Sequence, residues 1–178
     1  AGGAISIDAR SLAITDGASV SARTFTPPDA PDATGDAGSI HLAADSVTVS
    51  NRSDVSAAAW GSQGDAGAIT IDADSLNIDA TDGYAIVWVN SQSPRGSFVG
   101  ALGGAGDPSV PGAPGTIEIS AGSVTLLDGG SIQSACGHCS AERKDRAVDA
   151  ATVHVTAESM VVDGESKTET NTSFVWAG

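Results

Sequence analysis

The chain has 178 residues, a length typical of one compact domain. Its 22 acidic residues outnumber its 8 Lys and Arg residues, which gives a formal net charge of −14. This balance argues against nucleic acid or an anionic membrane as a partner, because both bind basic surfaces. Hydrophobic residues make up 40% of the chain, too many for a disordered acidic tail. No apolar run approaches the roughly 20 residues of a membrane-spanning helix, so we expect no membrane insertion.

A ten-residue pattern occurs five times along the chain. It reads Φ-x-Φ-x-Ala-x-Ser-Φ-x-Φ, where Φ is apolar and x is any residue. The five copies span residues 5–14, 40–49, 69–78, 117–126 and 153–162. Alternation with a period of two places the Φ side chains on one face. Each copy therefore predicts two short strands joined at a corner of small residues.

A third short strand is expected about fifteen residues after the first Φ of each unit. The apolar residues at this place are Val20, Val55, Ile86 and Ile132. The fifth unit has only Thr168 there, so the pattern gives little support to a third strand in that unit. Asp16-Gly17 and Asp128-Gly129 predict the turn that precedes the third strand, because Asp-Gly favours tight turns.

Three short strands per repeat are typical of a parallel β-helix, an all-β solenoid in which each coil stacks on the next. We expect about five coils in a single domain spanning residues 1–178. The residues beyond a bare coil form insertions on one side, at about 23–34, 91–114 and 136–149. Loops on one side of a solenoid often carry its binding function.

One serine of each copy recurs at the corner, where only a small side chain fits. These serines are Ser11, Ser46, Ser75, Ser123 and Ser159. We interpret them as a structural corner ladder, in which the hydroxyls bond to one another or to corner backbone groups.

The repeated phrase also carries a family resemblance. Gly-x-Ala-Gly-x-Ile-x-Ile-x-Ala-x-Ser-Leu-x-Ile-x-Asp-Gly-Ala-x-Val is matched best by Gly3 to Ala22 and by Gly35 to Ala57. It resembles the haemagglutination-activity repeats of filamentous haemagglutinin-like exoproteins, which bacteria secrete by the two-partner route. The resemblance implies a right-handed parallel β-helix that is secreted to the bacterial surface. It also implies an adhesin or a structural fibre.

Cys136-Gly-His-Cys139 is the most conspicuous short motif. We interpret Cys136 and Cys139 as a disulfide or a free thiol pair within the third insertion. Two alternatives remain open, a metal site helped by His138 and a redox-active pair. A complete metal site needs more ligands than two thiolates, and nothing in the sequence predicts the fold that activates redox cysteines.

Asp45 and Asp74 occupy equivalent places in adjacent units. They are weak candidates for a calcium site, and the sequence predicts no cofactor. Polysaccharide-cleaving β-helix enzymes use clustered carboxylates in a groove, so a lyase or hydrolase is a minor alternative. The main interpretation of these residues is an acidic solvated surface on a protein that is not an enzyme.

The ends of the stack show no helix or polar coil that would cap them. We therefore expect either continuation in a longer solenoid or end-to-end self-association of this chain. Either arrangement predicts a secreted structural or adhesive β-helix, a segment or subunit of a bacterial surface fibre. The alternative is a module that uses its insertions to bind a glycan, a host-cell ligand or another protein.

Overall fold

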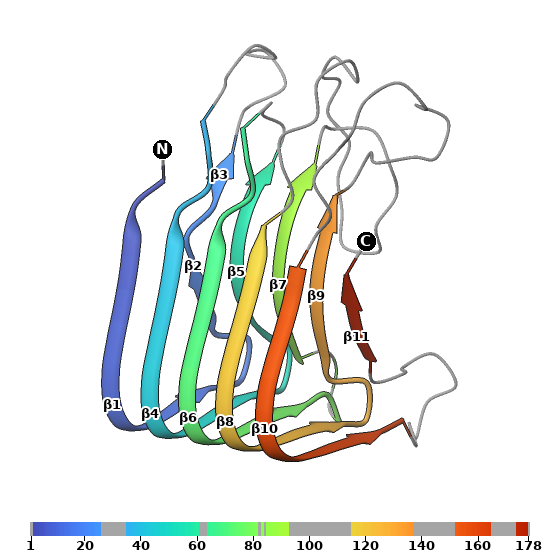
Figure 1. Cartoon of the computed structure of the whole chain (residues 1–178). Helices are drawn as coiled ribbons and strands as arrows, with labels where there is room; N and C mark the ends of the chain where they lie inside the picture. Colours follow the sequence, from blue (N-terminus) through green and yellow to red (C-terminus); the bar gives the residue numbers. More distant parts are fainter. Residues whose placement is uncertain are drawn as a thin grey trace.

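The computed structural model describes residues 2–25, 35–60, 64–81, 83, 85–92, 115–136, 152–164 and 174–177. Every regular element in these ranges is a strand (Figure 1). The strands are β1 (Ala4–Ile14), β2 (Ser19–Ser21), β3 (Thr24–Phe25), β4 (Ser39–Ser50), β5 (Ser53–Trp60), β6 (Ala68–Asp79), β7 (Ala85–Gln92), β8 (Thr116–Leu127), β9 (Ser131–Cys136), β10 (Thr152–Asp163) and β11 (Phe174–Ala177). No helix that could cross a lipid bilayer is present in the described ranges.

The strands form two parallel sheets, and the chain alternates between them. The first sheet has the order β1-β4-β6-β8-β10, and the second has the order β11-β9-β7-β5-β2 with β3 also paired to β5. All strand pairs are parallel. Figure 1 shows the strands of the second sheet behind those of the first. The prediction of an all-β protein built from parallel strands is confirmed.

The first sheet pairs the copies of the repeat residue for residue. Ile40 pairs with Ile5 on one side and with Ile69 on the other. Each copy forms one continuous strand of 11 or 12 residues, so the prediction of two separate short strands was wrong. The strands bend near their lower ends (Figure 1), and the register skips one position between the repeated Ala and Ser. The skipped residues are Arg10, Asp45, Asp74, Gly122 and Glu158.

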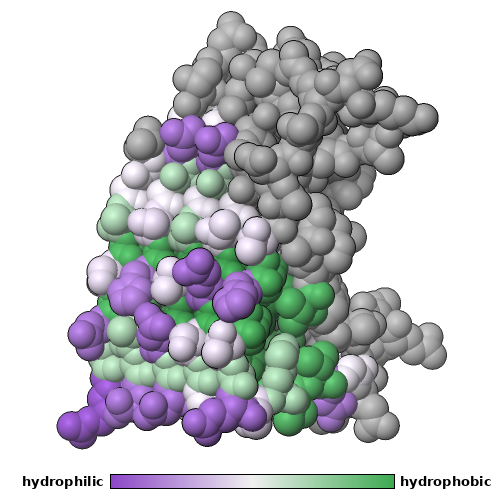
Figure 2. All heavy atoms as spheres, in the orientation of Figure 1, coloured by the Kyte–Doolittle hydropathy of each residue, from purple (hydrophilic) through white to green (hydrophobic). Residues whose placement is uncertain are grey.

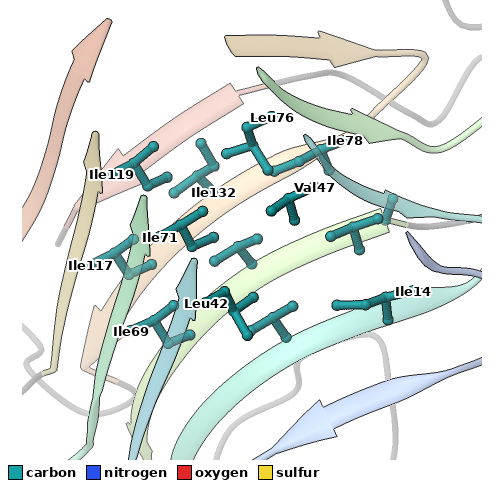
Figure 3. Packing of buried hydrophobic residues seen from close by; sticks show 14 of the residues in the cluster. Ile14, Leu42, Val47, Ile69, Ile71, Leu76, Ile78, Ile117, Ile119 and Ile132 are labelled. Carbon is teal, nitrogen blue, oxygen red and sulfur yellow. The ribbon is translucent and has the colours of Figure 1, made fainter. Parts of the chain in front are cut away.

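The hydrophobic core lies between the two sheets. The Φ side chains of β4, β6 and β8 are almost completely buried. From the second sheet, Val55, Val87 and Ile132 are fully buried in the same cluster. Figure 3 shows Ile132 lying among the side chains of Ile71 and Ile119 from the first sheet. Since neighbouring units bury the same columns, no unit forms this core alone.

Outward residues of the first sheet also form columns. Figure 2 shows this face as rows of similar hydropathy that cross the strands, with a hydrophilic row at the lower end. This banding follows from the in-register pairing, because equivalent places of successive units lie side by side.

The turns between the sheets use left-handed backbone. Asp16 and Gly17 have φ values of 57° and 83°, and Asp128 and Gly129 have values of 49° and 99°. The predicted Asp-Gly turns are thus confirmed. In the second unit, Asn51 and Arg52 take the same conformation with φ values of 54° and 66°, although Arg seldom adopts it.

Glycines at the start of the first-sheet strands are required by close packing. A Cβ on Gly67 would lie inside van der Waals contact of the Gly38 carbonyl oxygen, and a Cβ on Gly38 would meet the Gly3 carbonyl in the same way. Neither glycine has a positive φ, so a turn conformation does not explain them. The backbones of successive units simply approach too closely there for a side chain.

The third strands differ from the prediction at two places. Val55 pairs with Val87, which pairs with Ile132, so Val87 and not Ile86 occupies the buried column of the third unit. In the fifth unit, the third strand is β11, with Val175 paired to Ile132. Thr168 lies outside the described residues.

Most of the three predicted insertions also lies outside the described residues. At the edges of these ranges, β3 begins at Thr24, β7 continues to Gln92 and β9 ends at Cys136. Thr24 and Phe25, at the start of the first predicted insertion, still pair with β5.

Candidate functional site

The corner serines occupy one register column across all five first-sheet strands. The Ser46 hydroxyl donates to the Ser11 hydroxyl at 2.9 Å, and the Ser75 hydroxyl donates to the Asp45 backbone oxygen at 3.5 Å. These contacts link neighbouring units. Their chemistry is that of surface hydrogen bonds, each of which adds about 1 kcal/mol or less.

Asp45 and Asp74 are neighbours at the skipped position, and both are exposed. No group of three His, Cys, Asp or Glu side chains within the described ranges is arranged to hold a metal ion. Calcium takes six to eight oxygen ligands, and two carboxylates supply only part of that set. Calcium binding at this pair stays a prediction.

The cysteine motif falls where the structure gives no side-chain description. Cys136 ends β9, while Cys139 and His138 lie outside the described residues. The disulfide, thiol, metal and redox interpretations of the motif all stay predictions.

A contact between two ionisable side chains joins neighbouring strands of the first sheet. His41 Nδ1 lies 3.9 Å from Asp72 Oδ2, and about half of each side chain is exposed. An exposed pair of this kind adds little stability. We assign it to the solvated outer face of the sheet.

Two buried oxygens at the start of β5 were not anticipated from the sequence. Ser53 Oγ and Asp54 Oδ2 have no hydrogen-bond partner among the described residues. Ser53 is fully buried and lies two residues before the buried Val55, on the same side of the strand. Buried hydroxyls usually have a hydrogen-bond partner. The sequence carried no signal that these two oxygens would lack one.

The strongest candidate for function is the edge of the two sheets formed by β10 and β11, named here the β10–β11 edge. Here the core columns reach solvent. Met160 is 42% exposed, Val162 is 49% exposed and Val175 is 40% exposed. Their partners one unit earlier, Val124, Leu126 and Ile132, are at most 1% exposed. The Φ places of the fifth copy were visible in the sequence, but their exposure was not.

The backbone of this edge is equally open. β10 is the last strand of the first sheet and β11 is the last of the second, with no further strand beside either in the described part of the chain. Figure 2 shows hydrophobic surface at the right-hand side of the lower half of this face, on the side of β10 and beyond the end of the hydrophilic row. An edge strand offers unpaired N–H and C=O groups to another strand.

The chain matches no protein-family model, no curated protein and no solved structure. Its function is therefore argued from this geometry. The described residues place no catalytic set in one location, whereas the β10–β11 edge combines open backbone with exposed core side chains. That combination is suited to binding a strand of another unit.

The opposite edge is formed by β1 and β2, named here the β1–β2 edge. Ile14 is 3% exposed, while Ile5, Leu12 and Val20 are partly buried against the core. β1 pairs only with β4, and β2 only with β5, among the described strands. Equivalent positions of the repeat therefore lie at both edges, which face in opposite directions.

Proposed function

We propose that the chain is a right-handed parallel β-helix that serves as a structural and adhesive scaffold outside a bacterial cell. It acts as a segment or self-stacking subunit of a surface fibre. The observation that carries this proposal is the β10–β11 edge, where Met160, Val162 and Val175 expose 40% or more of their surface. Among the described residues no polar cover closes this core, which favours a neighbouring unit that completes it.

The solenoid part of the proposal is supported by the path of the chain. The strands alternate between two sheets, and every repeat pairs with the next in the same register. The units are also linked at the start of the first-sheet strands. The Gly38 N–H donates to the Ala22 carbonyl at 3.0 Å, and the Gly67 N–H donates to the Ala57 carbonyl at 3.2 Å. These bonds join the second sheet of one unit to the first sheet of the next.

The structural role is supported by the positions at which the copies of the repeat carry the same kind of residue. The fixed positions of the repeat are the inward Φ residues and the small corner residues, and a glycine precedes the first strand in four of the five units. The outward positions vary from unit to unit, as His41, Thr70 and Glu118 do in one column. The surface location rests on the resemblance of the repeat to secreted exoproteins.

Negative-stain electron microscopy of the purified chain over a concentration series tests the proposal. We expect filaments whose subunit repeat is close to the height of five stacked strands, roughly 24 Å at the usual strand spacing. Dispersed particles at every concentration would rule out the self-stacking subunit. Small-angle scattering of the same samples then reports whether the single chain has the dimensions of a five-strand stack.

A further inference from the structure

We propose that the β10–β11 edge binds the β1–β2 edge of a second copy of this chain, head to tail and in the register used inside the chain. β1 of the second copy pairs in parallel with β10 of the first. This inference rests on the proposed scaffold function, and it names the partner and the contact residues of that scaffold. The occupant is a second copy because the two edges are complementary in length, in apolar pattern and in charge.

The first match is in length and backbone. β1 has 11 residues and β10 has 12, and both belong to the same repeat. Each has a neighbour on one side only among the described strands. Since β1 pairs in parallel with β4, and β10 with β8, adding β1 beside β10 continues a parallel ladder without a change of direction.

The second match is in the inward side chains. The register places Ile5 beside Val153, Leu12 beside Met160 and Ile14 beside Val162. In the second sheet it places Val20 beside Val175. Met160, Val162 and Val175 are the side chains whose exposure is unusual for this core. The contact buries them against apolar side chains of the kind that cover the same columns elsewhere in the stack.

The third match is in charge. Arg10 and Glu158 hold the skipped position in β1 and β10. Both are exposed, and neither forms an ion pair with any other described residue. Head-to-tail contact brings the Arg10 guanidinium next to the Glu158 carboxylate. Across two like edges, the same position would face itself and bring equal charges together.

The geometry makes the contact heterologous, so it does not close on a pair of copies and leads to an open chain of subunits. Each copy carries a formal net charge of −14, so copies repel one another at long range. Salt screens that repulsion over a Debye length of about 8 Å at physiological ionic strength. We therefore expect association to strengthen from low to moderate salt, with the Arg10–Glu158 pair setting register.

Disulfide trapping tests the contact directly. Ser11 and Ser159 end the serine column at the two edges, and both are exposed. In the proposed register their Cα atoms lie about 5 Å apart, within the range a disulfide spans. A mixture of Ser11→Cys and Ser159→Cys chains is oxidised, and we expect a cross-linked dimer. The unchanged chain reports any background from Cys136 and Cys139.

The matched control is a mixture of Ser6→Cys and Ser159→Cys chains. Ser6 is also exposed on β1 but lies five residues before Ser11, about 16 Å away along a strand. We expect no cross-link in this mixture. Equal cross-linking in both mixtures, or none in the first, overturns the proposed register. Filaments by microscopy without the Ser11–Ser159 cross-link would refute this interface and leave the scaffold proposal standing. The cross-link without filaments would support this interface and refute the scaffold proposal.

Charge reversal tests the specificity of the same contact by sedimentation. We expect Arg10→Glu and Glu158→Arg each to raise the concentration for half-association about tenfold, because each places like charges together. The double variant restores both the opposite charges and the original net charge. We expect it to associate within about twofold of the unchanged chain. Glu118→Arg, on the interior strand β8, changes net charge as Glu158→Arg does and serves as the control. A double variant as weak as the singles overturns the pairing.

Discussion

The carbonyl oxygen of Gly38 lies where a side chain on Gly67 would have to begin. The two residues occupy equivalent places in successive units, just before β4 and β6. The same relationship joins Gly3 to Gly38. Side-by-side packing of successive units thus depends on a column without side chains, where one backbone lies directly against the next.

Gly67→Ala is expected to destabilise the fold by about 3 kcal/mol, because the added methyl group overlaps the Gly38 carbonyl and Ala57 Cβ. Gly3→Ala is the matched control, since a Cβ there meets nothing within 4 Å. We expect its free energy of unfolding to change by less than about 0.5 kcal/mol. Urea denaturation followed by circular dichroism measures both. Equal effects of the two substitutions would contradict this account of the glycine column.

Arg52→Gly is expected to stabilise the chain by about 0.5–1 kcal/mol. Arg52 is exposed and has a φ of 66°, which costs an L-residue energy that glycine avoids. Arg52→Ala removes the same side chain but keeps the strained backbone, so its stability should not rise. Thermal melting of both variants separates the two causes. A gain with alanine as large as that with glycine would show that the side chain, not the backbone, is unfavourable.

Ile71→Ala and Val162→Ala should differ sharply in their effects on the single chain. Ile71 is fully buried in the middle unit, and its truncation is expected to cost about 3–4 kcal/mol. Val162 is 49% exposed, so its truncation should cost less than about 1 kcal/mol. Chemical denaturation at low concentration gives both values. A large loss for Val162→Ala at low concentration would mean that this residue already supports the isolated fold.

Ser134→Ala is expected to cost about 1 kcal/mol. The buried Ser134 hydroxyl donates to the Gly115 carbonyl at 2.6 Å, which ties the third strand of the fourth unit to the start of its first strand. Losing a buried partner costs more than losing an exposed one. Ser46→Ala, which removes the more exposed bond to Ser11, is therefore expected to cost less. Melting temperatures of the two variants, measured in the same buffer, rank them.

The sequence was sufficient to predict the parallel all-β character and the inward columns. Residues such as Ile69 and Ile71 alternate with polar residues in a repeated frame, so their burial follows from periodicity alone. The turn at Asp16-Gly17 was also predictable, because Asp-Gly favours positive φ. The turn at Asn51-Arg52 was not, because Arg seldom adopts a positive φ.

Register was predictable only where the repeat has constant length. The third unit has three extra residues before its third strand, one more than the prediction of Ile86 assumes. The inward place therefore belongs to Val87. Both are β-branched, so side-chain type could not decide between them. β11 was missed because Val175 follows its first strand at a longer interval than in the other units. Only pairing with β9 identifies it.

The exposed apolar edge was the least predictable feature of the candidate site. Met160 and Val162 match the pattern of buried residues as well as Val124 and Leu126 do. A pattern reports which side of a strand faces inward but not whether another strand follows. Sequence reasoning therefore placed these residues in the core, whereas their side chains are nearly half exposed.

The parallel ladders described above also decide how such a molecule would respond to mechanical load. In both sheets the backbone hydrogen bonds point from strand to strand, along the direction in which the units succeed one another. A pull along that direction acts along these bonds, and the two units can part only when the whole ladder between β6 and β8 is broken.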